Sequence, residues 1–148
     1  RGELRHQGAF VDIEVRDQNG SSPVALAINN GDIEMVDLLA SYGARLDTCD
    51  YFGWSPLMLA VKSNRKDIVD LLLSYGASPD YRNEIDKNQT ASMLAAEEGL
   101  RPILVSLLHH GADLDCQDSC GQTVLNYAFS ARRDDLCTWL IKLGATMR

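Results

Sequence analysis

The chain repeats one short pattern along its whole length. A Gly-Ala pair ends a helix-like apolar stretch at 43–44, 76–77, 111–112 and 144–145, and a fifth pair precedes them at 8–9. Successive pairs are 35, 33, 35 and 33 residues apart. Such a period predicts stacked supersecondary units, none of which buries its apolar face alone. We therefore expect one all-α solenoid domain over residues 1–148, and recognition rather than chemistry as its task.

Each period contains signals for two short helices. In the second unit, Ser55 and Pro56 are typical of an N-cap and of the first helical position. Asn64 stands where this helix must stop in a left-handed conformation, which Asn tolerates. A second helix is predicted over residues 67–75, and Gly76 ends it. The connection between units is rich in Asp, Gly and Ser and predicts a projecting, hairpin-like turn.

A six-residue run opens the first helix of each unit. The copies are SPVALA at 22–27, SPLMLA at 55–60, TASMLA at 90–95 and TVLNYA at 123–128, and Asp-x-x-Gly precedes three of them at 17–20, 50–53 and 118–121. These units resemble ankyrin repeats, whose mark is T-P-L-H-x-A. The resemblance implies an ankyrin-repeat α-solenoid of antiparallel helix pairs with β-hairpin-like turns. Its repeats are expected at about 16–48, 49–81, 82–116 and 117–148, after a partial repeat at 1–15.

The chain departs from the family pattern at several places. The family His is replaced in all copies, by Ala25, Met58, Met93 and Asn126, and the resemblance therefore implies a less stable array. The third unit carries two extra residues in its turn, at 81–87. Residues 1–8 resemble only a second helix and its stop. We therefore expect the chain to be a fragment of a longer protein, with a natural cap as the alternative.

Composition and cysteine usage narrow the class of partner. The net charge of −7 and pI of about 4.8 argue against a nucleic acid, which needs clustered Lys and Arg. No apolar run approaches the roughly 20 residues of a membrane helix, so direct membrane insertion is not expected. The four cysteines fit reduced thiols in an intracellular protein, cytoplasmic with a nuclear location left open. His109 and His110, with Cys116 and Cys120, fit no standard zinc spacing, so neither metal nor cofactor is expected.

The sequence contains none of the common catalytic motifs, so no enzyme activity is expected. Phosphate-binding glycine loops, the H-E-x-x-H metal motif and the G-x-S-x-G elbow are all absent. Adjacent acids such as Glu97 and Glu98 point apart on a helix and are interpreted first as a solvated face.

Ankyrin-type arrays bind proteins along a concave face made of the turns and the first helices. Carried over by position, this implies a protein-binding set of Gln18, Asn19, Ser21, Tyr51, Phe52, Trp54, Lys62, Gln89, Glu97, Glu98 and Gln122. Tyr51, Phe52 and Trp54 stand out, because three aromatics at an exposed turn tip are costly unless something covers them. The alternative is that they pack on neighbouring turns or on the rest of the parent protein.

We therefore predict a protein–protein interaction module of a scaffold or regulatory protein. An apolar anchor beside Glu97 and Glu98 would suit a protein or peptide partner with a large hydrophobic residue next to Lys or Arg. One alternative is an intramolecular regulatory domain that packs on a catalytic or channel domain of its parent. The other is a stoichiometric enzyme inhibitor.

Overall fold

The computed structural model of the chain describes residues 3–6 and 9–146. The elements are, in order, β1 (Glu3–His6), β2 (Ala9–Asp12), α1 (Pro23–Asn29), α2 (Ile33–Ser41), α3 (Pro56–Lys62), α4 (Lys66–Ser74), α5 (Ala91–Glu98), α6 (Arg101–His109), α7 (Val124–Ser130) and α8 (Asp134–Lys142). The chain divides into two compact units, residues 1–78 and 79–148, here called unit 1 and unit 2. Unit 1 therefore holds α1–α4 and unit 2 holds α5–α8.

The first helix of each pair begins as the sequence predicts. The side-chain oxygens of Ser22, Ser55 and Thr90 accept hydrogen bonds from backbone N–H groups inside α1, α3 and α5, at 3.2–3.4 Å. These bonds satisfy amides that have no partner within the helix. Before α7, Thr123 forms a capping box with Asn126. Asn126 stands at the family His position, so an amide here ties the helix start together.

Left-handed residues end the first helices and turn the chain into the second ones. Asn64 has φ of +53°, as the sequence predicts, and Arg132 has φ of +59°. A side chain at positive φ is strained, and Asn accommodates it more easily than Arg. Pro102 lies in the first turn of α6, where a proline is tolerated because the early amides have no partner within the helix.

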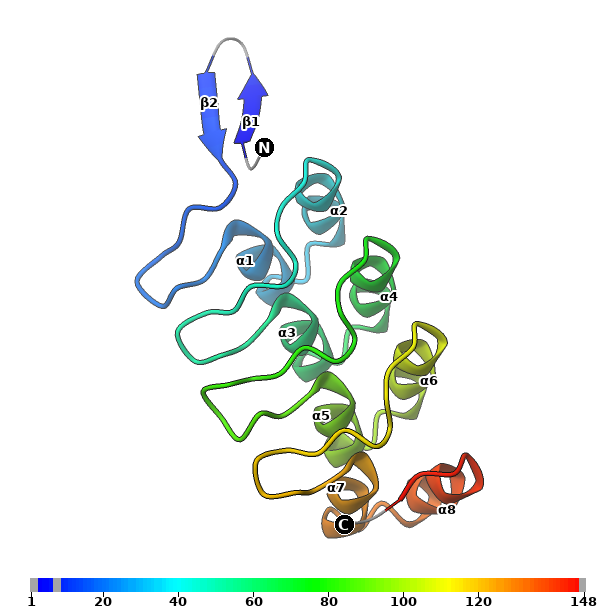
Figure 1. The fold of residues 1–148 in the computed structure, drawn as a ribbon. Helices are drawn as coiled ribbons and strands as arrows, with labels where there is room; N and C mark the ends of the chain where they lie inside the picture. Colours follow the sequence, from blue (N-terminus) through cyan, green and yellow to red (C-terminus); the bar gives the residue numbers. More distant parts are fainter. Residues whose placement is uncertain (1–2, 7–8, 147–148) are drawn as a thin grey trace. The chain divides into compact units, whose positions relative to one another are not determined.

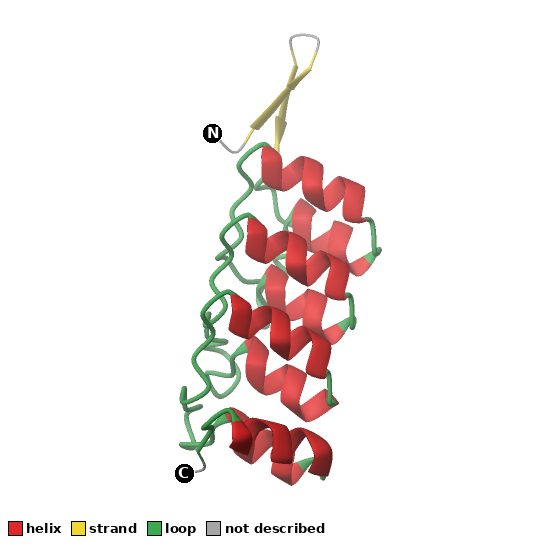
Figure 2. Ribbon diagram, turned by 90° about the vertical axis from the view of Figure 1, so that its right-hand side faces the viewer, coloured by secondary structure: helices red, strands yellow, loops and turns green. Residues whose placement is uncertain are grey.

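Within each unit the helices form two layers. In unit 1, α1 packs beside α3 and α2 beside α4, and in unit 2 α5 packs beside α7 (Figure 1). In each unit the long turns lie on one side of the helices and the short connections on the other (Figure 2). The core between layers is aliphatic, with Val36, Ile68 and Leu72 of unit 1 and Leu104 and Leu140 of unit 2 fully buried. The fold is thus the expected all-α repeat solenoid.

The expectation of a second helix over residues 1–8 is wrong for the part that the structure describes. Residues 3–6 form β1, which pairs antiparallel with β2 from Glu3 opposite Asp12 to His6 opposite Ala9. Only Gln7 and Gly8 separate the strands, and a two-residue connection with Gly favours a hairpin. The Gly8-Ala9 pair had suggested a helix stop by analogy with the later repeats. Residues 1–2 and 7–8 lie outside the described residues.

The leucines that recur at two positions of each repeat are expected to be buried between repeats, and six of these eight side chains are. Leu94, Leu125, Leu39, Leu72, Leu107 and Leu140 are buried, as expected. Leu26 is 42% exposed and Leu59 is only half-buried. Leu26 is exposed because, among the described residues, no helix pair lies before α1 to cover it.

Candidate protein-interaction surface

Two aromatic side chains project from the second turn of unit 1. Tyr51 is 65% exposed and Phe52 is 58% exposed, as expected from the sequence. The backbone that carries them is fixed by Asp50, whose Oδ1 accepts hydrogen bonds from the N–H groups of Phe52 and Trp54, both at 2.9 Å. Asp17 binds the N–H groups of Asn19 and Ser21 in the same way in the first turn. The tips are therefore preorganised rather than loose.

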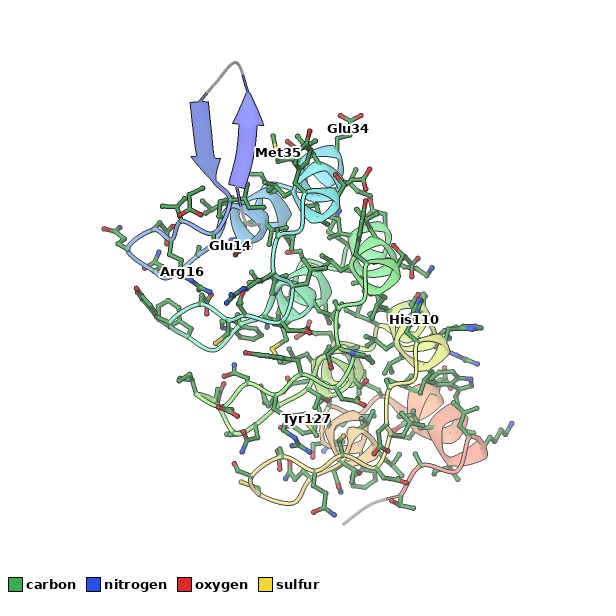
Figure 3. The ribbon with its side chains drawn as sticks, turned by 45° about the horizontal axis from the view of Figure 1, so that its top comes forward. Glu14, Arg16, Glu34, Met35, His110 and Tyr127 are labelled. Atoms are coloured by element: carbon green, nitrogen blue, oxygen red, sulfur yellow. The ribbon has the colours of Figure 1, made fainter. Side chains whose placement is uncertain are left out.

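An arginine ties the two turns of unit 1 to each other. Arg16 Nη1 donates to the carbonyl of Gly20 at 2.6 Å and to that of Cys49 at 2.7 Å (Figure 3). The Tyr51 N–H donates to the carbonyl of Asn19 at 3.1 Å. The Tyr51 ring also lies against Gly20, where an added Cβ would come within 2.6 Å of Tyr51 Cδ1. Tyr51 thus packs on the neighbouring turn with one edge and stays open on the other.

Trp54 does not occupy the exposed position that the sequence predicts for it. Its side chain is half-buried, and Lys62 Nζ lies 5.8 Å from the centre of its ring. A cation over an indole face is an attractive contact. Trp54 and Lys62 therefore form one joined surface at the base of the turn, whereas Tyr51 and Phe52 form the tip.

The polar members of the predicted set in unit 1 differ in exposure. Gln18 and Asn19 are exposed. Ser21 is 8% exposed, so its side chain offers little area to a partner, and its membership of the binding set stays a prediction.

In unit 2 the predicted residues lie at the end of α5 and in the last turn. Glu97 and Glu98 are exposed on the final turn of α5, and Gln122 is exposed before α7. Gln89 is half-buried, and its Nε2 donates to the hydroxyl of Tyr127 at 3.1 Å. Gln89 therefore supports the turn, while the other three residues remain open to solvent.

Unit 2 repeats the arginine tie of unit 1. Arg82 Nη1 donates to the carbonyl of Gln117 at 2.6 Å and to that of Asn88 at 3.4 Å. Neither tie was predicted from the sequence. The available signal was an arginine at the same place in two turns, Arg16 and Arg82, which are 66 residues apart.

Below the last turn of unit 2, Tyr127 and Asp118 form a buried pair. The Tyr127 hydroxyl donates to Asp118 Oδ2 at 2.6 Å (Figure 3). Burial alone would raise the pKa of Asp118, but hydrogen bonds from Tyr127, Gln122 N–H and Cys120 N–H outweigh it and lower that pKa. Burial and the same carboxylate raise the pKa of Tyr127. The pair is therefore a carboxylate and a neutral phenol at neutral pH, which is a structural contact.

An exposed apolar residue in the turn with the insertion was not predicted from the sequence. Ile85 is 68% exposed in the turn with the two extra residues. Its N–H donates to Asn83 Oδ1 at 3.0 Å, so the loop is built around a buried asparagine. The signal for it was an isoleucine placed inside a polar insertion.

Two of the four cysteines have raised pKa values. Burial, followed by the charges of Asp80 and Asp113, raises the pKa of Cys116, and burial raises the pKa of Cys137. A raised pKa keeps a thiol protonated and weakly nucleophilic. Within residues 3–6 and 9–146, no three His, Cys, Asp or Glu side chains come together as a metal would require. In the same part of the chain, no helix has the length and apolar character needed to cross a membrane.

Comparison with known proteins agrees with this architecture. A family model described as ankyrin repeats, built from three copies, matches residues 4–83 and again residues 79–148. The search of curated proteins gave no match.

Proposed function

The chain belongs to the ankyrin repeat family, and from this premise we propose that it is a non-catalytic module that binds a protein or peptide on its turns and first helices. Ankyrin repeats are in general protein–protein interaction modules. The exposed side chains of this chain indicate which residues make the contact and which partner chemistry they select.

The exposed aromatic tip of unit 1 carries this proposal. Tyr51 and Phe52 keep 65% and 58% of their surfaces open, although their backbone is fixed by Asp50. A rigid aromatic pair loses little conformational entropy on binding, and aromatic residues dominate interface hot spots. Exposure of this kind is therefore better explained by a partner than by stability.

The charged residues favour a partner with basic character. Glu97 and Glu98 are exposed, and the chain has a net charge of −7. We expect the partner segment to combine a large hydrophobic residue, which would contact Tyr51 and Phe52, with Lys or Arg. Complementary charge of this kind raises the rate of association and the specificity more than the affinity.

A random peptide library displayed on phage tests both the site and the chemistry. Peptides selected on the folded chain are expected to share a large apolar residue beside Lys or Arg. Phe52→Ser is expected to weaken the binding of a selected peptide at least about 10-fold, since removing a hot-spot aromatic has effects of this size. Isothermal titration calorimetry with the synthetic peptide measures the change.

Tyr42→Ser supplies the matched control. Tyr42 is an aromatic residue of similar exposure, 51%, but it lies at the end of α2 and away from the turns. Its replacement is expected to leave peptide binding unchanged. Binding that survives Phe52→Ser and is lost in Tyr42→Ser would place the interface on the outer helices and refute the proposed surface.

Two other roles would use the same exposed surface. The same aromatic tip would serve an intramolecular contact, in which the module packs on a catalytic or channel domain of its parent. It would also serve a stoichiometric inhibitor that covers an enzyme. Both use the surface proposed here, and they differ only in where the partner is encoded.

A further inference from the structure

The helix pair α1/α2 presents an uncovered apolar face. Leu26, Met35 and Leu38, here called the leading face, are 42%, 41% and 42% exposed. They line a groove of about 720 Å³ together with Val15 and Pro23. Met35 lies on α2 beside Glu34 in Figure 3. A contiguous apolar surface of this kind marks a contact with another molecule.

The same positions are covered in the next helix pair of unit 1. Ile68 of α4 stands one repeat after Met35 and is fully buried, whereas Leu59 and Leu71 are half-buried. They are covered because α1 and α2 pack on α3 and α4. In unit 2 the corresponding positions of the last pair behave similarly, with Tyr127 and Leu136 buried.

The last helix pair is uncovered on its opposite side. We call this side, which consists of Phe129, Cys137 and Ile141, the trailing face. Phe129 is 64% exposed and Ile141 is 60% exposed, and Cys137 is half-buried. The corresponding residues of the first pair are buried and consist of Ile28, Val36 and Ala40. Solenoids that end freely in water carry terminal repeats with polar outer faces. Neither the leading face nor the trailing face has this character.

The two uncovered faces are the two halves of one contact that the molecule already makes. Inside each unit, the trailing face of one helix pair packs against the leading face of the next. The exposed trailing face of α7/α8 and the exposed leading face of α1/α2 therefore repeat the two sides of this contact, and they can pack against each other from different copies of the chain.

A second feature of the repeated contact fixes its register. In both units, an arginine before the second helix of the later pair lies over the left-handed glycine of the earlier pair. Arg65 Nη2 donates to the carbonyl of Gly31 at 3.1 Å, and an added Cβ on Gly31 would come within 2.7 Å of Arg65 Nη1. In unit 2, a Cβ added to Gly99 would come within 3.2 Å of Arg133 Cδ. Both contacts thus place an arginine over a glycine.

The α1/α2 and α7/α8 pairs carry different residues at these two positions. The residue before α2 is Asp32, where α4 and α8 have arginine and α6 has Leu100. The left-handed residue before α8 is Arg132, where Gly31, Asn64 and Gly99 stand earlier. An arginine at the left-handed position would repel an arginine placed over it, but it attracts an aspartate. Asp32 and Arg132 are therefore complementary to each other and mismatched to the junctions inside the units.

We propose that the chain associates end to end with a second copy of itself, the leading face of one copy on the trailing face of the next. Asp32 of one copy then pairs with Arg132 of the other, and Phe129 and Ile141 enter the groove lined by Leu26 and Met35. The contact is heterologous, so it leaves one free face at each end and can extend beyond a dimer.

Charge reversal tests the proposal. Sedimentation equilibrium of the unmodified chain is expected to show an average mass that rises with protein concentration. Asp32→Arg opposes an arginine to Arg132, and Arg132→Asp opposes an aspartate to Asp32, so each variant alone is expected to raise the dissociation constant at least about 10-fold. Asp32→Arg removes the cap bond from the Met35 N–H to Asp32, but α4 and α8 begin after an arginine without such a bond, and aspartate tolerates the left-handed region, so both variants should fold. Circular dichroism verifies this.

The decisive sample is an equimolar mixture of the two variants. At one kind of mixed junction, the arginine introduced by Asp32→Arg meets the aspartate introduced by Arg132→Asp. At the other kind, the native Asp32 and Arg132 meet, so both are attractive and association is expected to return. Phe129→Ser, at an exposed position, is expected to weaken association without rescue. Arg45→Asp, a charge reversal at an exposed residue outside both faces, is the matched control and should change nothing.

Two results would overturn the proposal. A mass that stays monomeric at every concentration would assign these faces to another occupant, such as a helix pair of the parent protein. Association that persists in both single variants, or fails to return in the mixture, would show that the copies meet through a different surface.

Discussion

At the scale of single residues, Asp118 shows how one carboxylate can organise a whole turn. Its Oδ1 accepts the N–H groups of Cys120 and Gln122 at 2.9 and 2.8 Å, and its Oδ2 accepts the Tyr127 hydroxyl. Gln89 reaches the same hydroxyl from the preceding turn. Asp118 itself is 6% exposed, so these donors replace the water that it loses. A side chain expected only as part of an Asp-x-x-Gly motif thereby joins two turns and α7.

Tyr127→Phe removes a side-chain donor to Asp118. We expect the free energy of unfolding to fall by about 1–2 kcal/mol at pH 7, the scale of a hydrogen bond to a charged group. The Tyr127 bond helps to lower the pKa of Asp118, so its stabilisation is present above the unfolded carboxyl pKa of about 4 and is lost as the pH falls through the folded value. The difference between variant and parent is therefore expected to be smaller in acid, below the unfolded carboxyl pKa, than at pH 7.

Urea unfolding followed by Trp139 fluorescence measures this effect. Trp139 lies in the same unit as Tyr127, and a Trp54→Phe background removes the other indole. Gln122→Ala is the control, because it keeps the backbone N–H that binds Asp118 and should show no pH-dependent difference. An equal loss of stability at both pH values would mean that Tyr127 contributes through packing alone.

At the scale of elements, the turns are joined to one another by arginine as well as by backbone pairing. Arg16 and Arg82 each donate to a carbonyl in their own turn and to one in the next. The family His, which the resemblance assigns to tying neighbouring turns together, is absent here. The two arginines form links of this kind, one in each unit.

Arg16→Ala tests the weight of these links. We expect the free energy of unfolding to fall by about 1 kcal/mol, since a charged donor is lost but the site is partly open to solvent. Arg45→Ala serves as control, because that arginine is also exposed but no such link involves its guanidinium. Urea denaturation followed by circular dichroism gives both values, and equal stability of the two variants would show that the link adds nothing.

The helices could be predicted from local sequence, whereas other features could not. Ser55 with Pro56 and the left-handed Asn64 are local signals, and the structure follows them. The β1–β2 pair was missed because Gly8-Ala9 imitates the helix stop of the later repeats. The exposure of Leu26 was missed because it depends on a neighbouring helix pair and not on the local pattern. Trp54 is half-buried, and its contact with Lys62 joins residues that lie eight positions apart, so the local pattern at the turn does not show it.

At the scale of the whole molecule, net charge acts on binding together with local charge. The chain carries −7, so any basic partner is attracted from a distance whichever surface it finally contacts. A charged residue near the contact adds an electrostatic contribution to association that depends on its distance from the partner. Two variants with the same change of net charge at different places separate these contributions.

Glu97→Lys and Glu34→Lys are such a pair. Both residues are exposed. Glu97 lies in the last turn of α5, a first helix and thus part of the proposed binding surface, whereas Glu34 lies in α2, a second helix outside that surface. We expect Glu97→Lys to slow association with a basic peptide from the selection more than Glu34→Lys does, because a charge farther from the contact than about 8–10 Å is largely screened at physiological salt. For the same reason, Glu97→Lys should reduce the salt dependence of the association rate more strongly than Glu34→Lys. Stopped-flow fluorescence at several salt concentrations measures the slopes, and identical slopes for the two variants would remove Glu97 from the interface.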